Sequence, residues 1–214
     1  MARLPLMVEM ADRLAVIAGG GRAGGIKAAG LLEAGARVRV VSPTLNDASL
    51  RTGVAHDRVE WIPRAFTPAD LDGVFLAVAA TSERAVNRAV HAAARARGVL
   101  CLDARDPEAG DIVFASTLCR PPFVVAVSTG GRAPAVARAL ARHLDQQMGP
   151  EWQIYAELMA RARDEVKDKV PAPARGSILR TLADLPLLDV IRQRGEPEAR
   201  AEAAAVIRRA VDDR

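Results

Sequence analysis

The stretch LAVIAGGGRAGGIKAAGLLE, from Leu14 to Glu33, decides the fold that we expect for this chain. Its apolar start, Leu14 to Ala18, has the length of a buried β-strand and runs directly into three glycines. Ile26, Leu31 and Leu32 then follow with the spacing of a helix. The stretch therefore predicts a strand, a tight glycine turn and a helix in immediate succession.

Three glycines of this turn, Gly19, Gly21 and Gly24, satisfy the pattern G-x-G-x-x-G between a strand and a helix. Such glycines let the backbone approach a pyrophosphate, which lies on the unpaired N–H groups and the positive dipole end of the helix. Gly35 is placed to end the helix, and Arg37 to Val41 reads as the next strand. The pattern favours dinucleotide binding over a purely structural turn.

Strands and helices continue to alternate as far as Leu102. We expect strands at Val59 to Pro63, Val74 to Ala80 and Val99 to Leu102, with a helix over Glu83 to Arg97. Leu4 to Met10 reads as a short strand or an edge segment before the first strand. This order predicts an α/β fold with a Rossmann-type parallel sheet, whose ligand lies at the carboxyl ends of the strands.

The alternation stops after Leu102. Ile112 to Thr117 and Phe123 to Val127 are strand-like, and Ala135 to Gln147 has helical spacing. The loop before this helix reads Ser128-Thr129-Gly130-Gly131-Arg132. Its small residues at a helix N-terminus beside Arg132 form either an anion site or an ordinary capped turn.

From Met148 onward the pattern is helical, with Pro171 and Pro173 as an expected linker. The expected helices are Glu151 to Asp168, Ser177 to Leu182, Pro186 to Arg194 and Pro197 to Asp212. A small bundle has little interior, so we expect the apolar residues of this tail to pack on the rest of the chain or on a second subunit. They are Leu182, Leu185, Leu187, Leu188, Val190 and Ile191.

Composition limits the classes of function. The chain has 214 residues, half of them hydrophobic, without a membrane-length apolar run or a signal-peptide core, so we expect a cytoplasmic protein with no membrane partner. Only 3% of residues are aromatic, which argues against a nucleic-acid platform. The net charge of +4 comes mainly from arginine and suits a polyanionic ligand. The two cysteines, Cys101 and Cys119, are expected to be reduced thiols. The three histidines are not spaced as metal ligands, so no metal site is expected; they are His56, His91 and His143.

Two positions bear on the cofactor. Ser42 stands after the second strand, where a dinucleotide fold usually has Asp or Glu to hold the ribose hydroxyls. A serine can bond a ribose without repelling a 2′-phosphate, so this position does not decide between NAD and NADP. Thr81 closes the fourth strand and either contacts the cofactor or caps the following helix.

The whole layout resembles the precorrin-2 dehydrogenase / sirohydrochlorin ferrochelatase family, which includes the N-terminal part of sirohaem synthase. The resemblance runs from about Leu4 to about Lys169. The combination of a GGG turn, an AAT…N segment and an STGG loop is more specific than any single motif. The matching stretches are Leu4 to Leu6, Val16 to Gly21, Leu31 to Ala36, Ala79 to Thr81 with Val86-Asn87, Ile112 to Ala115, and Ala126 to Gly131 with Pro134.

The resemblance implies a homodimer that oxidises precorrin-2 to sirohydrochlorin with NAD, in sirohaem or cobalamin synthesis. It implies an NAD-binding Rossmann domain over 1–112, a dimerisation segment over 113–148 and a C-terminal helical domain over 149–214. It also implies that Gly21, Arg22 and Ala23 hold the pyrophosphate. In the same way, Pro43 and Thr44 flank the adenosine, Thr81 and Asn87 lie on the nicotinamide side, and the loop from Ser128 to Arg132 lines the tetrapyrrole pocket.

One motif departs from the family pattern, which reads Asn-x-x-Asp in the loop after the fifth strand. Arg105 stands at the aspartate position and Leu102 at the asparagine position. Arginine cannot act as a base, and we assign Arg105 to substrate binding. Asp103 and Asp106 flank it, and Asp106 is the preferred proton-transfer residue because it lies in a loop. The alternative is that hydride transfer needs no carboxylate of the protein.

Three other functions compete with the dehydrogenase. A dehydrogenase–ferrochelatase is weakened by Arg105 at the expected carboxylate position. A non-catalytic module that binds NAD or a tetrapyrrole is favoured by the same residue, and the intact STGG loop counts against it. A general small-substrate dehydrogenase is least favoured, because no His or Lys stands at a suitable position after the strands.

Overall fold

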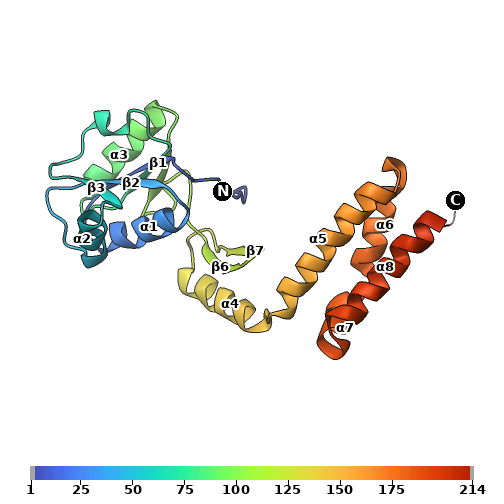
Figure 1. The fold of residues 1–214 in the computed structure, drawn as a ribbon. Helices are drawn as coiled ribbons and strands as arrows, with labels where there is room; N and C mark the ends of the chain where they lie inside the picture. Colours follow the sequence, from blue (N-terminus) through green and yellow to red (C-terminus); the bar gives the residue numbers. More distant parts are fainter. Residues whose placement is uncertain (1–2, 213–214) are drawn as a thin grey trace. The chain divides into compact units, whose positions relative to one another are not determined.

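The computed structural model describes residues 3–212, and the chain forms two compact units (Figure 1). The first unit takes the chain up to Phe114 together with Ser128–Ala133. The second holds Ala115–Val127 and the chain from Pro134 onward. The domain boundaries expected at residues 112 and 148 stay predictions, because compactness alone does not show which segments fold independently.

The first unit is built on a five-stranded parallel sheet in the order β3-β2-β1-β4-β5. This confirms the predicted α/β class with a Rossmann-type sheet. The first two strands match the prediction to the residue, and the others differ by one or two residues at their ends. The strands are β1 (Leu14–Ala18), β2 (Arg37–Val41), β3 (Val59–Ile62), β4 (Leu76–Ala79) and β5 (Leu100–Asp103).

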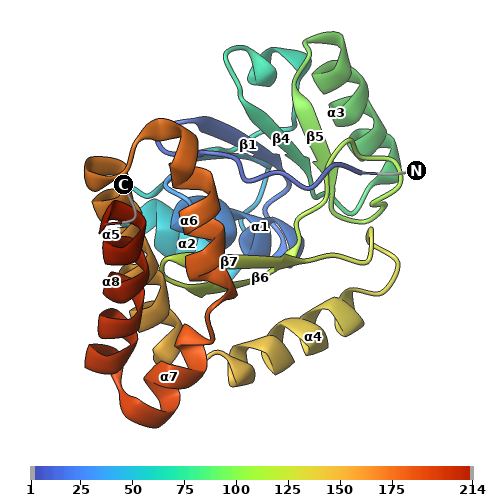
Figure 2. The ribbon, with the colours of Figure 1, turned by 90° about the vertical axis from the view of Figure 1, so that its right-hand side faces the viewer.

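Helices cover both faces of this sheet (Figures 1 and 2). Helices α1 (Arg22–Glu33) and α2 (Ala48–Ala55) pack on one face, and α3 (Arg84–Ala96) packs on the other. Successive side chains of a strand point to opposite faces, so Ile17 joins the core under α1 and α2 while Val16 joins the core under α3. A short 3₁₀ helix, η1 (Pro68–Leu71), precedes β4.

Helix α2 was not expected from the sequence. It has eight residues, and only Leu50 and Gly53 are buried, so it lacks the long apolar repeat that identifies a helix. Its start is instead set by Asp47, whose side chain accepts hydrogen bonds from the backbone N–H groups of Ser49 and Leu50.

The segment from Leu4 to Met10 is not a strand, contrary to one of its two predicted forms. The edges of the sheet are β3 and β5, and this segment pairs with neither. Leu4 and Leu6 are largely exposed, and Met10 alone at the end of the segment is buried in the core.

The second unit begins with an antiparallel hairpin of β6 (Ser116–Arg120) and β7 (Phe123–Val127), against which α4 (Pro134–Gln147) packs. The strand expected from Ile112 to Thr117 is therefore wrong over its first four residues. Ile112 and Phe114 are partly buried against the core of the first unit, so their apolar character serves packing rather than strand pairing.

Helices α5 (Glu151–Lys169), α6 (Ala172–Asp184), α7 (Leu187–Arg194) and α8 (Glu196–Asp212) enclose a core of their own. Leu182 and Leu187 are fully buried in it, so the four helices cover these two side chains by themselves, contrary to expectation. Packing of the tail on a second subunit stays a prediction. Pro173 lies in the first turn of α6 rather than in a linker, because this turn does not require its N–H. Within residues 3–212 no helix is long and apolar enough to cross a bilayer.

Candidate functional site

The glycine turn lies at the carboxyl end of β1, where β1 and β4 are neighbours. Gly19 has a φ of +118°, and a methyl group on it would lie 2.6 Å from the carbonyl oxygen of Ala80. Its N–H donates to the carbonyl of Val41 at 3.0 Å. The order of the strands reverses at β1, so the turn occupies the point where α/β sheets bind ligands.

The N-terminus of α1 is open to a ligand. Gly21 is the N-cap and no side chain caps the helix, whose first turn holds no acidic residue. The N–H of Gly25 donates to the carbonyl of Gly21 at 3.0 Å, so the N–H groups of Arg22 and Ala23 have no partner within the helix. A methyl group on Gly21 would have no atom within 4 Å. This space and these donors fit a phosphate group.

Two other glycines of the turn are required by the backbone around them. A methyl group on Gly20 would lie 2.1 Å from the carbonyl oxygen of Thr44, and one on Gly24 would lie 2.4 Å from that of Gly19. These are contacts with main-chain atoms, which cannot move aside as a flexible side chain can. The turn is therefore held against the loop that follows β2.

The loop after β2 carries the three residues predicted for the adenosine side. Ser42 is buried; its N–H donates to the carbonyl of Ile62, and its carbonyl accepts from Trp61 Nε1 at 2.9 Å. Pro43 and Thr44 are exposed. The structure therefore places all three residues beside the glycine turn, with Pro43 and Thr44 open to solvent.

Thr81 follows β4 and is tied to Asn87 of α3. Asn87 is 1% exposed, and its Oδ1 accepts from the N–H of Thr81 at 3.1 Å and from Thr81 Oγ1 at 2.7 Å. The hydroxyl of Thr81 also accepts from the N–H of Glu83, the N-cap of α3. Thr81 thus contributes to the start of the helix, and its contact with a cofactor stays a prediction.

The loop after β5 separates the two candidate carboxylates. Asp103 is buried, and its Oδ1 accepts from the N–H groups of Arg105 at 2.8 Å and Asp106 at 2.9 Å. Asp106 is exposed, with one weak bond from the N–H of Glu108 at 3.2 Å. Arg105 Nη1 donates to the carbonyl of Ser82. Asp103 therefore holds the loop, while Asp106 is open to a ligand.

The loop Ser128–Ala133 belongs to the first unit, although β7 and α4 on either side of it belong to the second. Gly131 has a φ of +87°, and a methyl group on it would lie 2.5 Å from the Cβ of Pro107. Thr129 Oγ1 accepts from the N–H of Ala133 at 2.9 Å, which is the capped turn offered as one alternative. The predicted substrate loop thus lies directly on the loop after β5.

Exposed arginines supply the charge of the site. Arg22 begins α1, while Arg105 and Arg132 lie in two loops of the first unit, and none of the three forms an ion pair with a described carboxylate. Exposed guanidinium groups without a carboxylate partner suit a ligand with several carboxylates or phosphates. In the described part of the chain, no three His, Cys, Asp or Glu side chains are grouped to hold a metal ion.

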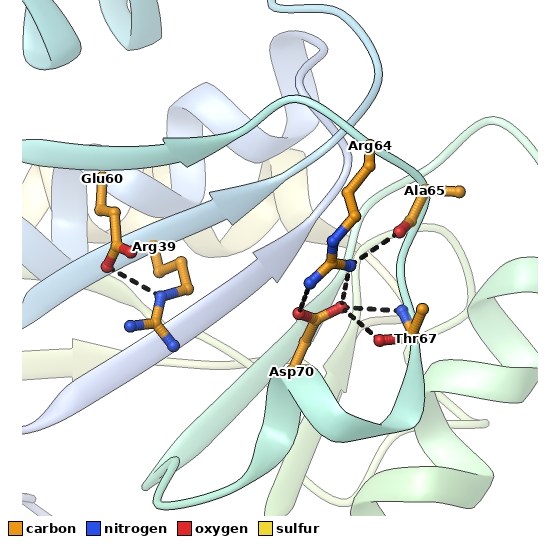
Figure 3. Close-up of polar contacts among 6 residues, drawn as sticks. All are labelled: Arg39, Glu60, Arg64, Ala65, Thr67 and Asp70. Atoms are coloured by element: carbon orange, nitrogen blue, oxygen red, sulfur yellow. Dashed lines mark hydrogen bonds and ion pairs between the residues drawn. The ribbon is translucent and has the colours of Figure 1, made fainter.

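A fourth loop, after β3, is held by charge (Figure 3). Arg64 makes two bonds to the carboxylate of Asp70, at 2.8 and 2.6 Å, and the N–H of Thr67 donates to the same group at 2.7 Å. The hydrogen bonds from Arg64 lower the pKa of Asp70 below its ordinary value. The pair of Arg39 and Glu60, at 2.8 Å, links two strands, and its acidic side chain is 54% exposed compared with 4% for that of Asp70.

Sequence reasoning missed two residues near the site. Arg3 donates hydrogen bonds to carbonyl groups of the two loops that meet at Pro107. Lys27 of α1 lies with Nζ 4.9 Å from the ring centre of Phe114, and burial lowers its pKa. Neither contact leaves a local signal in the sequence, because the partners are far apart along the chain.

Cys101 lies in β5 beneath the site and is fully buried. Burial, with Asp111 and Asp103 nearby, raises the pKa of its thiol to about 12. A thiol that stays protonated at neutral pH is a poor nucleophile, so Cys101 is a core residue.

A family model described as putative NAD(P)-binding matches residues 6–116 of the chain. The siroheme synthase of Chromobacterium violaceum is 36% identical over 203 residues, covering 94% of this chain and 43% of the relative. The siroheme synthase of Methylobacillus flagellatus is 36% identical over 169 residues, covering 79% and 36%. The chain thus spans less than half the length of these curated relatives.

A solved structure described as "SirC, precorrin-2 dehydrogenase" has a TM-score of 0.69 to this chain. The match covers 97% of this chain and all of that one, at 20% sequence identity. Likeness at this level of identity shows that the two proteins share a fold.

Proposed function

The chain belongs to the putative NAD(P)-binding family, and we propose that it oxidises precorrin-2 to sirohydrochlorin with NAD as the hydride acceptor. The observation that carries the proposal is the pairing of an open α1 N-terminus with exposed arginines on the loops of the same unit. The first feature suits a dinucleotide and the second suits a substrate with eight carboxylates. The names of the siroheme synthase relatives support the same reaction.

The turn after β1 holds the pyrophosphate through the N–H groups of Arg22 and Ala23. Ser42, Pro43 and Thr44 flank the adenosine, and Thr81 borders the nicotinamide ring. When bound, NAD supplies the carbon that accepts the hydride. Asn87 is 1% exposed and accepts hydrogen bonds from the N–H and the hydroxyl of Thr81, so its part on the nicotinamide side is to hold Thr81 in place.

Precorrin-2 loses one hydrogen as a hydride and a second as a proton. Asp106 accepts the proton, because it is exposed while Asp103 is occupied by two backbone N–H groups. Arg105 and Arg132 pair with carboxylates of the substrate, and the loop Ser128–Gly131 forms the wall between them. In this arrangement the carboxylates of the substrate lie at the loops that carry Arg105 and Arg132 rather than over the sheet.

The chain acts as a homodimer in this proposal. Leu118 of β6 is buried, while Val124 and Cys119, which are paired across the hairpin, are exposed. An exposed apolar strand face of this kind suits pairing with a second copy. The size of the protein in solution, measured by light scattering, tests this part.

The test of the reaction is an anaerobic assay with precorrin-2 generated in situ and NAD or NADP supplied separately. We expect the sirohydrochlorin spectrum to appear with NAD. Asp106→Asn lowers kcat by about 10²- to 10⁴-fold, because the proton loses its acceptor. Glu108→Gln, an exposed carboxylate two residues away, is the matched control and keeps the wild-type rate. An unchanged rate in Asp106→Asn removes Asp106 from the mechanism.

A second candidate is a module that binds NAD or a tetrapyrrole without oxidising it. It is favoured by Arg105 at the expected base position, because Asp103 beside it is buried and its Oδ1 already accepts two backbone N–H groups. Tight NAD binding with no oxidation of precorrin-2 supports the module. Insertion of ferrous iron into sirohydrochlorin by the same sample supports the dehydrogenase–ferrochelatase.

A further inference from the structure

The guanidinium group of Arg3 reaches three backbone carbonyls that belong to two loops. Its Nη1 donates to the carbonyl of Gly130 at 3.2 Å. Its Nη2 donates to the carbonyl of Pro107 and lies 3.4 Å from that of Gly110. We propose that Arg3 is a positioning residue that clasps the loop Ser128–Ala133 to the loop after β5.

Arginine suits this position because its donors form a rigid planar fork that can serve several acceptors at once. The three acceptors lie in turns rather than in helices or strands. Among the described residues, no backbone N–H donates to the carbonyls of Pro107, Gly110 or Gly130. Arg3 therefore donates to acceptors that the loops leave unused. Without Arg3, these carbonyls would accept hydrogen bonds from water instead.

The clasp adds to one contact that the loops make by themselves. Gly131 lies so close to Pro107 that a methyl group on Gly131 would be 2.5 Å from the Cβ of Pro107. This packing contact sets how near the loops come but is non-directional. The hydrogen bonds of Arg3 are directional, so they set the orientation of one loop relative to the other.

The orientation matters because each loop carries a residue of the proposed site. Asp106 is attached to one loop and Arg132 to the other, so the clasp fixes the distance between the proton acceptor and a carboxylate-binding arginine. This step rests on the proposed function. The holding of the loops themselves does not, and it is measurable without a substrate.

The experiment compares Arg3→Met and Arg3→Lys with the control Arg37→Met. Arg37 is another exposed arginine of the same unit, and its Nε donates to a single carbonyl, that of Asp12, at 3.1 Å. Hydrogen exchange followed by mass spectrometry reports on peptides over 104–112 and 126–134. Steady-state kinetics give KM and kcat for precorrin-2, and a titration gives the affinity for NAD.

We expect Arg3→Met to speed exchange in both peptides and to raise KM for precorrin-2, each by about tenfold, the loss of roughly one net hydrogen bond. Its kcat and NAD affinity stay within about twofold of wild type, because the β1 turn is untouched. Arg3→Lys, with a single nitrogen, falls between wild type and Arg3→Met. Arg37→Met matches wild type in both loops.

Unchanged exchange in Arg3→Met overturns the clasp, whatever the kinetics show. Faster exchange with an unchanged KM overturns the positioning role. If the wild-type protein never oxidises precorrin-2, the proposed function fails, and the exchange data still decide whether Arg3 holds the loops. If circular dichroism shows that Arg3→Met is unfolded, Arg3→Lys provides the same comparison.

Discussion

The first unit has two glycine loops, and they are held in place by different means. In the turn after β1, main-chain atoms fill the space around Gly19, Gly20 and Gly24; they belong to the segments after β4 and β2 and, for Gly24, to the turn itself. In the loop Ser128–Ala133, the close neighbour of Gly131 is the side chain of Pro107. The first turn is thus packed against the backbone at the carboxyl ends of the strands. The second loop rests on a side chain of the loop after β5, so we expect that it can be loosened without unfolding the unit.

The largest effect on stability and NAD binding is expected where a methyl group collides with the main chain around the turn after β1. Gly20→Ala places its Cβ 2.1 Å from the carbonyl oxygen of Thr44, which costs about 3 kcal/mol in the free energy of unfolding and abolishes NAD binding. Urea unfolding measures the first and a fluorescence titration the second. Gly30→Ala is the control, because a methyl group there has no atom within 4 Å and stabilises α1 by about 0.5–1 kcal/mol. Equal unfolding midpoints for Gly20→Ala and wild type contradict the comparison.

The next effect separates binding from folding within the same turn. Gly21→Ala has no atom within 4 Å of its new methyl group, so we expect no clash and only the loss of about 1 kcal/mol or less that alanine costs at an N-cap. The methyl group fills the space on the side of the proposed pyrophosphate and weakens NAD binding by at least about tenfold. Calorimetric titration with NAD measures this. Unchanged affinity shows that the pyrophosphate does not approach Gly21.

In the loop Ser128–Ala133 a methyl group is expected to act on the substrate rather than on the fold. Gly131→Ala meets Pro107 and has a φ of +87°, so the loop shifts at a local cost of about 1–2 kcal/mol. KM for precorrin-2 rises by about tenfold, while NAD affinity is unchanged. Gly130→Ala is the control, with a φ of +66° but no atom within 4 Å. Equal effects of the two variants on KM assign the change to backbone strain rather than to Pro107.

The smallest effect concerns the loop after β3, which is held by charge rather than by glycine. The pKa of Asp70 is lowered in the folded protein by its bonds from Arg64, so the stability it adds is present above about pH 4, the unfolded pKa, and is lost as pH falls through the folded pKa. Asp70→Asn therefore destabilises the protein at pH 7, and the difference from wild type shrinks below about pH 4. Thermal unfolding from pH 3 to 7 measures it. Glu60→Gln, in the exposed pair of Figure 3, is the control; an equally large effect there removes the special role of Asp70.

The difference between the two loops also explains what the sequence could predict. The β1 strand, the glycine turn and the start of α1 were predicted because each feature is encoded by adjacent residues. Helix α2 was not predicted because its start depends on the side chain of Asp47 rather than on a repeat of apolar residues. The apolar run at Ile112 was misread as a strand, because a short apolar segment does not reveal whether it pairs or packs.

At the candidate site, long-range contacts limit what the sequence can predict. Asp103 and Asp106 look alike in the sequence, and only the folded loop shows that one is buried and occupied while the other is exposed. The hydrogen bond from Arg3 to Gly130 joins residues 127 positions apart. No local pattern marks such a contact, so a single sequence does not predict it.

The path of the chain through its two units implies an order of events during synthesis. A ribosome releases β1 to β5 before the hairpin, so the parallel sheet and the turn after β1 can form on the nascent chain first. Ser128–Ala133 emerges only after β6 and β7, elements of the other unit, have been made. A nascent chain that ends at Phe114 would therefore carry the whole sheet and the glycine turn after β1, while the loop proposed to line the substrate pocket is added later.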